Sequence, residues 1–308
     1  MNDRDCHSEP FGHWHEGTFL PHEVFAGLEP PYSNLQKAKA VILPVPYDST
    51  SEWRSGSRHG PQAIIDASQY LELYDLELDR EIYKVGISTL PGVEPLLSSP
   101  QDMINRVYEV ARGLVQREKF VVVLGGEHSL SLGVVRAFKE AFPRLSVLQL
   151  DAHADLRDEY LGTKYGQACV MRRIFELCPI SQAGVRSLSW DEKQFLTERK
   201  LKPFYMSDLA SSTTSIDQIV HSLGEDVYVT IDVDVLDPSI MPAVGTPEPD
   251  GLSWRQMLSI IESVTLRKHV VGFDLMEFCP AEGPSSCAFL LAKLAYKFIG
   301  CALPLQER

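Results

Sequence analysis

Residues 148–171, "LQLDAHADLRDEYLGTKYGQACVM", begin as an apolar run and then carry Asp151, His153 and Asp155 at every second position. An apolar run without polar alternation is typical of a strand that is buried on both faces of a sheet. Side chains two positions apart on a strand point to the same side. We therefore expect these three polar side chains to converge where a buried strand ends.

Apolar runs of this kind recur along the chain and alternate with segments of helical pattern. The alternation predicts βαβ units, and hence an α/β fold of three layers with helices on both faces of a mainly parallel sheet of about eight strands. The predicted strands span 40–46, 120–126, 145–153, 227–235 and 269–275, with weaker candidates at 82–88, 180–187 and 202–206. The predicted helices span 61–73, 101–117, 129–141, 167–177, 190–200, 214–223, 253–265 and 285–299.

The domain organisation that we predict is a single catalytic domain over residues 36–308, preceded by an irregular N-terminal extension at 1–35. Ser253 is expected to be the N-cap of the helix at 253–265. The histidines of the N-terminal "CHSEPFGHWHE" are interpreted as chance residues of a flexible tail and not as a metal site.

The composition excludes several classes of function. The 308 residues carry a formal net charge of −13, which argues against a nucleic-acid partner because such binding needs a basic surface. No apolar segment has the length of a membrane span or the form of a signal peptide. The six cysteines form no C-x-x-C pair, so free thiols in a reducing compartment are expected. We therefore expect a cytoplasmic protein without a membrane partner.

Two further predicted strands end in side chains that could bind a metal. The segment "VVVLGGEHS" ends near His128, and "VYVTIDVDVLD" contains Asp232 and Asp234. In open α/β sheets, functional residues gather at the carboxyl ends of the strands. A lone D-x-D is usually a turn and a lone histidine usually structural, but here polar clusters recur at three such ends. The predicted metal ligands are His128, Asp151, His153, Asp155, Asp232 and Asp234.

The ligand set predicts the number and kind of metal ions. Four carboxylates and two imidazoles in one place would repel or stay protonated unless cations balance them. With bridging carboxylates, such a set suits two divalent ions about 3.5–4 Å apart. Oxygen and nitrogen ligands without sulfur favour Mn²⁺, with Fe, Co, Ni or Zn as alternatives.

Three motifs now point to a family. The segments "GGEHS" (125–129), "DAHAD" (151–155) and "DVDVLDPS" (232–239) resemble, in this order, the signature of the ureohydrolases, the family of arginases and agmatinases. The resemblance extends over roughly residues 40–300, and "KYGQACVMRR", "GVRSLS" and "AFLLAKLAYKFIG" are most similar to the shorter bacterial agmatinases. It implies the arginase-type fold and, by analogy, a homo-oligomer, either a trimer or a hexamer.

The resemblance also implies the roles of the ligands. One ion would be held by His128, Asp151, Asp155 and Asp232, and the other by Asp151, His153, Asp232 and Asp234. A hydroxide that bridges the two ions would attack the carbon of a guanidinium group and release urea and an amine.

The resemblance also implies roles in substrate binding and proton transfer for two carboxylates, one of which, Asp155, is also a predicted ligand. Glu277, in "DLMEF", would receive the guanidinium group through paired charged hydrogen bonds, and Asp155 would pass a proton to the leaving amine. Asp274 would either support a ligand or be a structural carboxylate.

The loop at 157–167 is where we expect the substrate to be selected. It lacks the polar pattern with which arginases hold an α-carboxylate, and offers Asp158, Glu159 and Tyr160 instead. A small cationic guanidino compound therefore fits, and agmatine, hydrolysed to putrescine and urea in polyamine biosynthesis, fits best. Gln167 stands where many agmatinases carry a histidine; it is predicted to contact substrate, although an amide does not titrate.

The sequence leaves several alternative substrates and functions open. Guanidinobutyrate, guanidine and arginine are other candidate substrates, and Lys164 would suit the anionic tail of the first. A catalytically impaired metal-binding homologue is supported only by Gln167. A two-metal phosphatase would need basic phosphate-binding residues, for which Arg157 is the one candidate.

Overall fold

The structure of the chain is a computed structural model that describes residues 23–209 and 214–304. The N-terminal histidine-containing segment lies outside the described residues, as does most of the extension predicted at 1–35. Phe25, inside that extension, is fully buried, and its backbone N–H donates to Thr89 Oγ1 at 2.8 Å. The domain boundary at residue 36 therefore stays a prediction.

Eight strands form one sheet, in the order β4-β1-β5-β10-β9-β6-β7-β8. Every neighbouring pair in it is parallel, which confirms the predicted fold class. The strands are β1 (Ala40–Val45), β4 (Ile87–Thr89), β5 (Phe120–Gly125), β6 (Ser146–Leu150), β7 (Ile180–Val185), β8 (Phe204–Tyr205), β9 (Asp226–Asp232) and β10 (His269–Met276). A separate hairpin pairs β2 (Tyr74–Asp75) with β3 (Arg80–Glu81).

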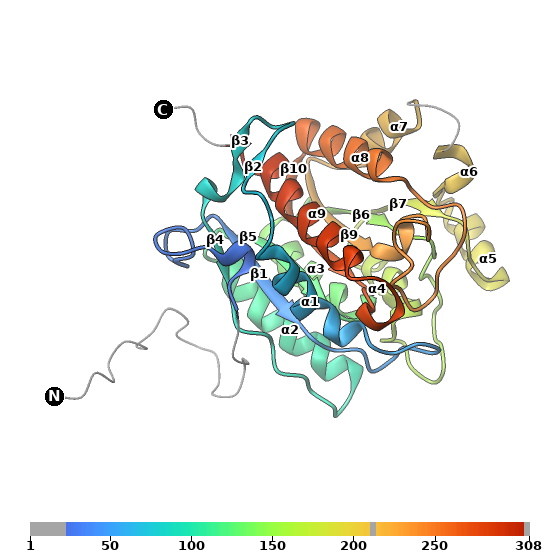
Figure 1. The fold of residues 1–308 in the computed structure, drawn as a ribbon. Helices are drawn as coiled ribbons and strands as arrows, with labels where there is room; N and C mark the ends of the chain where they lie inside the picture. Colours follow the sequence, from blue (N-terminus) through green and yellow to red (C-terminus); the bar gives the residue numbers. More distant parts are fainter. Residues whose placement is uncertain (1–22, 210–213, 305–308) are drawn as a thin grey trace.

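Helices cover both faces of the sheet and make the second and third layers (Figure 1). One face is covered by α1 (Gly60–Ser68), α6 (Met206–Leu209), α7 (Thr214–Ser222), α8 (Trp254–Arg267) and α9 (Ser286–Ala302). The other is covered by α2 (Pro100–Val115), α3 (Ser131–Ala141), α4 (Val170–Phe175) and α5 (Trp190–Arg199). Because both faces are covered, the strands are mostly apolar.

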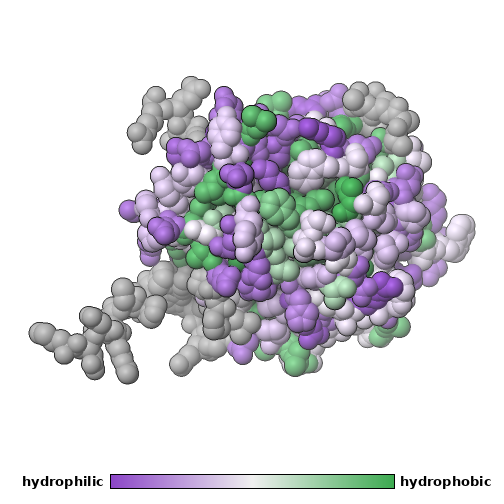
Figure 2. All heavy atoms as spheres, viewed as in Figure 1, coloured by the Kyte–Doolittle hydropathy of each residue, from purple (hydrophilic) through white to green (hydrophobic). Residues whose placement is uncertain are grey.

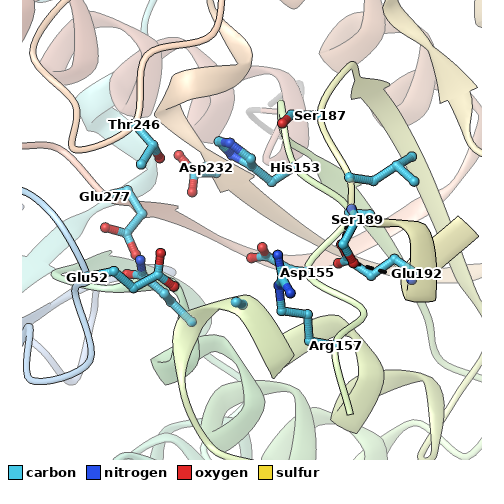
Figure 3. A pocket seen from close by; sticks show the side chains of 14 residues that line it. Glu52, His153, Asp155, Arg157, Ser187, Ser189, Glu192, Asp232, Thr246 and Glu277 are labelled. Atoms are coloured by element: carbon cyan, nitrogen blue, oxygen red, sulfur yellow. Dashed lines mark hydrogen bonds between the residues drawn. The ribbon is translucent and has the colours of Figure 1, made fainter. Parts of the chain in front are cut away.

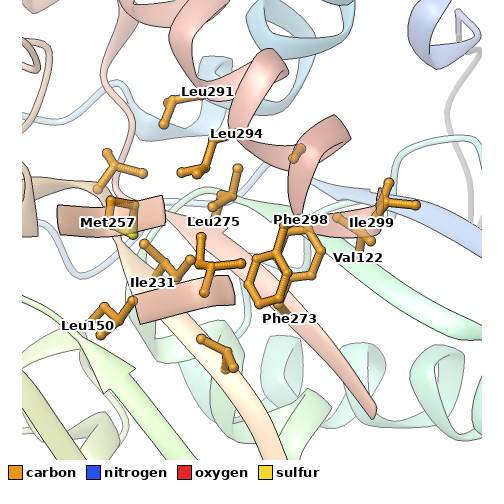
Figure 4. Packing of buried hydrophobic residues seen from close by; sticks show 14 of the residues in the cluster. Val122, Leu150, Ile231, Met257, Phe273, Leu275, Leu291, Leu294, Phe298 and Ile299 are labelled. Carbon is orange, nitrogen blue, oxygen red and sulfur yellow. The ribbon is translucent and has the colours of Figure 1, made fainter. Parts of the chain in front are cut away.

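The core under α9 fixes the central strands in place (Figure 4). Phe273 of β10 stacks on Phe298 of α9 with ring centroids 4.1 Å apart, and Ile231 and Leu275 pack in the same cluster. Each of these four side chains is at most 1% exposed. Close packing of this kind leaves little freedom to the strands, so the loops at their carboxyl ends start from fixed positions.

The boundaries of several elements differ from the predicted ones. Ser253 does cap α8, because its side chain accepts from Gln256 N–H and the Gln256 side chain accepts from Ser253 N–H. The helix predicted at 61–73 ends at Ser68. The strand predicted at 82–88 is mostly a 3-10 turn, since Gly86 adopts a left-handed φ of 78° and only β4 beyond it is extended.

The surface over α9 combines polar and apolar side chains, with apolar ones gathered near the middle of the view in Figure 2. Phe289 is 43% exposed there, and it lines a hollow of about 440 Å³ together with Trp254 and Leu290. Among the described helices, none combines the length and the apolar character that crossing a bilayer requires.

Candidate metal centre

The carboxyl ends of four adjacent strands bring the predicted ligands together. β5, β10, β9 and β6 are consecutive in the sheet although they are far apart in sequence. His128 follows β5, Glu277 follows β10, Asp232 ends β9, and Asp151 follows β6. Because the strands are parallel, these four positions lie along the same edge of the sheet, as the strand-end rule predicts.

His128 reaches the centre because the chain turns sharply after β5. Gly126 packs so tightly there that a Cβ would lie 1.9 Å from the carbonyl oxygen of Tyr47, which only glycine avoids. The imidazole is fully buried, and its Nδ1 lies 3.1 Å from an Asp151 oxygen, 3.3 Å from one of Asp155 and 3.6 Å from one of Asp232.

Nδ1 of His128 nevertheless makes no hydrogen bond with acceptable geometry. Buried polar atoms are nearly always paired, so this nitrogen, which faces the oxygens of three carboxylates, is placed as a metal ligand would be. A second group is formed by Asp151, His153 and Asp234, with His153 Nδ1 at 2.9 Å from an Asp234 oxygen and 3.7 Å from one of Asp151. Asp151 belongs to both groups, so the residues present fit two ions that share a bridging carboxylate.

The convergence arises only in part from strand geometry, which corrects the sequence argument: beyond β6, His153 still forms an isolated parallel bridge with Ser187. β6 ends at Leu150, and Asp155 adopts a left-handed φ of 52°. The loop is held by two hydrogen bonds instead: His153 N–H donates to Asp151 Oδ1 at 2.6 Å, and Ala152 N–H donates to Asp234 Oδ1 at 3.1 Å. The predicted side chains meet, but through a loop folded around their own carboxylates.

Buried polar residues behind the ligands hold them in orientation. His128 Nε2 lies 2.8 Å from Thr230 Oγ1, and that hydroxyl lies 2.7 Å from Asp274 Oδ1. Asp274 also accepts from the hydroxyl of Tyr228 at 2.9 Å. Asp274 is therefore linked through Thr230 to His128, a predicted ligand, so its support of a ligand, the first of its two predicted roles, remains a prediction. Such partners fix the tautomer and the ring orientation of a ligating histidine.

Asp151 has a comparable support that sequence reasoning missed. Gln182 donates to Gln149 Oε1 at 2.5 Å, and Gln149 donates to Asp151 Oδ2 at 2.6 Å. Gln149 is fully buried. A polar residue inside the apolar run "LSVLQLD" was the available signal, because an interior amide needs hydrogen-bond partners.

The electrostatics of the cluster call for cations. Burial raises the pKa of Asp232 well above its usual range, and the neighbouring Asp234 and Asp151 raise it further. Burial and the Asp151 charge raise the pKa of Asp155 to about 7. Carboxylates this buried and this close cannot all ionise at neutral pH without compensating positive charge, and divalent ions supply it.

Glu277 stands beside the ligands in a strained backbone conformation. Its φ is 65°, its N–H donates to the Gly126 carbonyl at 2.8 Å, and its Oε1 accepts from His128 N–H at 2.6 Å. Burial raises the pKa of Glu277 well above its usual range, with a further contribution from Glu127. One carboxylate oxygen is thus tied to the loop that carries a predicted ligand.

Glu127, in "GGEHS", connects that loop to a distant one. It is fully buried and accepts from the Thr50 N–H at 2.5 Å and from the Thr50 hydroxyl at 2.8 Å. Thr50 Oγ1 in turn accepts from Gln167 N–H at 3.1 Å. Burial raises the pKa of Glu127 to about 6. Sequence reasoning missed this residue because it lies inside a motif in which only His128 drew attention.

A pocket of about 230 Å³ opens over the centre (Figure 3). Four predicted site residues line it besides Gln167: His153, Asp155, Asp232 and Glu277. Glu52, Arg157 and Thr246 also line it, and none of them was a predicted site residue. They come from loops that carry no periodic pattern, so the sequence offered no signal beyond the charges of Glu52 and Arg157.

Two predicted substrate contacts do not line this pocket. Asp158 is exposed and forms an ion pair with Arg173 at 2.5 Å, which lowers the pKa of its carboxyl group. Tyr160 lies under the Arg157 guanidinium, 4.5 Å from the ring centroid, and faces an adjoining hollow. The loop at 157–167 turns away after Arg157, whose N–H donates to the Ala168 carbonyl, and so it presents only its two ends to the pocket.

Comparisons with known proteins agree with this geometry. The Arginase family matches residues 38–301. The N(1)-aminopropylagmatine ureohydrolase of Synechocystis sp. is 38% identical over 272 residues, which cover 85% of this chain and 89% of the relative. Its counterpart in Thermus thermophilus is 37% identical, over 90% of this chain and 94% of the relative. The solved agmatine ureohydrolase of Thermoplasma volcanium has a TM-score of 0.80 at 33% identity and covers 87% and 90% of the two chains.

The fold and the site define an enzyme of the ureohydrolase class, a hydrolase that breaks C–N bonds in guanidino compounds. The chain belongs to the arginase family. Within that family it is similar to the enzymes that act on agmatine and its derivatives.

Proposed function

We propose that this enzyme uses two Mn²⁺ ions to hydrolyse a guanidinoalkylamine, agmatine in the first place, to urea and the free amine. The observation that carries the proposal is the buried, unbonded His128 Nδ1 among the oxygens of three carboxylates, Asp151, Asp155 and Asp232, which lie at the ends of two strands. His128, Asp151, Asp155 and Asp232 would hold one ion, and Asp151, His153, Asp232 and Asp234 the other. When bound, the ions would lower the pKa of a coordinated water so that it can attack at neutral pH.

The residues of the chain would place the substrate over the ions. Glu277 has one oxygen tied to His128 N–H, which leaves its other oxygen free for a guanidinium N–H. A charged pair held in this way fixes the carbon that is attacked. Asp155, which lines the pocket over the ions, is placed to pass a proton to the leaving amine.

A second substrate, N1-aminopropylagmatine, is favoured by the names of relatives. The Synechocystis and Thermus relatives, at 38% and 37% identity, are both named for it. It carries the same guanidinobutyl group as agmatine, extended at the amine by an aminopropyl tail. Either substrate meets Glu277 and the ions with the same end, so the difference must be made further out in the pocket.

Urea release from a panel of guanidino compounds tests the reaction. The protein is loaded with Mn²⁺ and given agmatine, N1-aminopropylagmatine, guanidinobutyrate, guanidine and arginine. We expect urea from one or both of the first two and at least tenfold less from arginine, because the loop at 157–167 lacks the polar pattern with which arginases hold an α-carboxylate. Urea from none of the five would overturn the proposal.

Metal analysis of the loaded protein tests the ion count separately. We expect about two Mn²⁺ per chain, and about one after Asp234→Asn, since Asp234 contributes to only one of the two groups. Co, Ni, Fe and Zn are tried in parallel because oxygen and nitrogen ligands accept all of them. A content of one ion per unmodified chain would contradict a binuclear centre.

The cellular setting belongs to the same proposal. We propose a cytoplasmic enzyme of polyamine biosynthesis that assembles as a trimer or hexamer. The exposed apolar side chains over α9 support association, since patches of this kind are often covered by a partner. Light scattering of the purified protein measures the assembly directly, and a monomer at micromolar concentration would exclude it.

A further inference from the structure

The segment "GVRS" (184–187), at the end of β7, contacts two loops that carry candidate metal ligands. The N–H groups of its last two residues both donate to the Ala152 carbonyl, at 2.8 and 3.0 Å. On its other side, Gly184 packs so tightly that a Cβ would lie 2.5 Å from Val235 Cγ2. The segment therefore touches both loops of the second candidate group, which consists of Asp151, His153 and Asp234.

Arg186, the third residue of this segment, donates from all five of its guanidinium N–H groups to backbone carbonyls. The acceptors are the carbonyl oxygens of Asp234 (2.7 Å), Pro249 (2.9 Å), Glu248 (3.0 Å), Gly184 (3.2 Å) and Val235 (3.4 Å). They belong to three segments that are far apart in the sequence. One side chain therefore joins the end of β7 to the turn after β9 and to the loop at 248–249.

Asp234 is the candidate ligand that this arrangement fixes most directly. Its N–H donates to Asp232 Oδ1 at 3.0 Å and its carbonyl accepts from Arg186, so its backbone is held on both sides. Its Oδ1 accepts from Ala152 N–H at 3.1 Å, and its Oδ2 lies 2.9 Å from His153 Nδ1. A shift of the turn would move this carboxylate away from the ring nitrogen that it faces.

The same guanidinium places a second carboxylate beside His153. The bonds to the two carbonyls of the loop at 248–249 hold that loop against the turn after β9. Glu248 Oε1 then lies 3.8 Å from His153 Nε2, the ring nitrogen that does not face Asp234. Carboxylates in this position orient the ring of a ligating histidine. Each nitrogen of His153 thus faces a carboxylate whose backbone Arg186 holds.

We propose that Arg186 is the positioning residue of the second metal group: it sets the orientation of Asp234 and His153, and thereby the affinity for one of the two ions. The assignment rests on the proposed function, which takes two ions. A lysine cannot replace the arginine, because an ammonium offers three donors at one point, whereas the planar guanidinium spreads five in fixed directions. None of the five carbonyls belongs to the ligands of the first ion alone, His128 and Asp155, so that ion should not depend on Arg186.

Metal binding by Arg186→Lys tests the proposal without relying on turnover. Protein stripped with EDTA and dialysed is titrated with Mn²⁺ in a calorimeter. We expect about two ions in the unmodified protein. In the variant, one Kd should rise about 10- to 100-fold, as when an outer partner of a metal ligand is removed, and the other should stay within about threefold.

The selective loss of one ion separates positioning from a general structural role. An arginine that only stabilised the fold would affect both ions together or neither, whatever its effect on unfolding in EDTA. An equal rise of both Kd values, or no rise of either, therefore overturns the assignment.

A double variant identifies the ion that is lost. Asp234→Asn alone should leave about one ion, and Arg186→Lys added to it should leave the same content, because two changes that act on one group are not additive. A content near zero in the double variant would place Arg186 at the first ion and contradict the proposal.

Glu248→Leu tests the same group if Arg186→Lys does not fold. It keeps every bond of Arg186, since these go to main-chain carbonyls, and removes only the side chain that faces His153. One Kd should again rise, by about tenfold. Two unchanged Kd values in this variant would overturn the proposal.

Arg267→Lys is the matched control. Arg267 also donates to a backbone carbonyl, that of Ser263, and it pairs with Asp217, but it lies at the end of α8, just before β10 begins and so at the opposite edge of the sheet. Both Kd values should stay within about threefold of the original; a loss equal to that of Arg186→Lys would contradict the proposal. Two bound ions without urea from any guanidino compound would overturn the reaction and leave the result for Arg186 intact. A single ion in the unmodified chain would overturn both.

Discussion

At the scale of single residues, two residues of the site have backbone conformations that residues other than glycine rarely adopt. Asp155 has a φ of 52° and Glu277 a φ of 65°. Left-handed conformations cost such residues about 1–3 kcal/mol and persist where the surroundings impose them. Around Glu277 the surroundings are two hydrogen bonds, one from its own N–H to Gly126 and one from His128 N–H to its carboxylate. The strain is consistent with a side chain that must point in one direction.

Replacing Glu277 with glutamine tests the guanidinium contact without disturbing this loop. The amide oxygen of Glu277→Gln can still accept from His128 N–H, but the charge that attracts the guanidinium is lost. We expect kcat/KM for the best substrate to fall by about 100-fold, as for other removed charged contacts to a reacting group. The thermal midpoint should not fall, because an uncompensated buried charge is removed.

Glu282→Gln serves as the control for this change. Glu282 follows on the same loop and pairs with Arg54, but it does not line the pocket. We expect its kcat/KM to stay within about threefold of the original. Full activity in Glu277→Gln, or an equal loss in both variants, would remove Glu277 from the site.

At the scale of elements, the β2–β3 hairpin is fastened to α9 by a buried ion pair. Lys297 Nζ lies 2.9 Å from Asp75 Oδ1, and each side chain is at most 3% exposed. Lys297 also contacts Glu77 at 2.5 Å, whereas Lys293 reaches Asp75 only at 3.8 Å from a more exposed position. The hairpin is short, so this contact fixes its place on the helix.

Lys297→Met should therefore destabilise the protein strongly. The methionine fills a similar volume but leaves the buried Asp75 carboxylate without its main partner, and a broken buried pair costs about 3–5 kcal/mol. Lys293→Met, the matched control, should cost less than about 1 kcal/mol because its ion pair is long and partly exposed. Urea denaturation of both variants measures the difference, and equal losses would mean that Lys297 is not the anchor.

The same pair makes a prediction for acid stability. Burial alone would raise the pKa of Asp75, but the Leu78 N–H and Lys297 outweigh it and lower the pKa below 3.8. A lowered folded-state pKa stabilises the fold above the unfolded-state value, and this contribution is lost as the pH falls through the folded-state value. The difference in unfolding free energy between the original protein and Asp75→Asn should therefore shrink below about pH 4. A difference that is constant from pH 7 to pH 3 would contradict the pairing.

The existence of the strands could be predicted from the sequence better than the positions at which they end, and the reason is physical. Covered strands must be apolar, so runs such as 120–126 are visible without tertiary information. The end of β6 at Leu150 is not visible, because it depends on hydrogen bonds that backbone N–H groups donate to the Asp151 and Asp234 carboxylates. That the candidate ligands would lie close together could be predicted from the strand ends, but the position of Glu52 could not, since its place in the pocket depends on how an irregular loop crosses the sheet edge.

At the scale of the whole molecule, the metal centre is assembled only when the sheet is complete. Its ligands follow β5, β6 and β9, and Glu277 follows β10, so four strands must be in register before the carboxylates meet. In the unfolded chain these groups are separated by scores of residues. Ions that bind the assembled centre therefore stabilise the entire fold, by about 2.7 kcal/mol at a free concentration 100 times the Kd.

The effect of Asp232→Asn on stability should therefore be opposite in the absence and in the presence of metal. Burial first, and then Asp234 and Asp151, raise the pKa of Asp232. A raised folded-state pKa makes the ionised carboxylate unfavourable, so stability is lost as the pH rises. Without metal at pH 7–8, Asp232→Asn should have a free energy of unfolding about 1 kcal/mol or more above that of the original protein. Its thermal midpoint should be correspondingly higher. With Mn²⁺ the order should reverse, because the variant loses ligands to both ions.

Asp237→Asn, in the same motif, provides the opposite control. Asp237 accepts from Ser239 N–H and Gly251 N–H, which lower the pKa of its carboxyl group, so its charge stabilises the turn in both states. This variant should lose stability with and without metal. Calorimetric unfolding of the three proteins in EDTA and in Mn²⁺ gives all six midpoints. If Asp232→Asn is less stable than the original protein in EDTA, the carboxylates are compensated by something other than divalent ions.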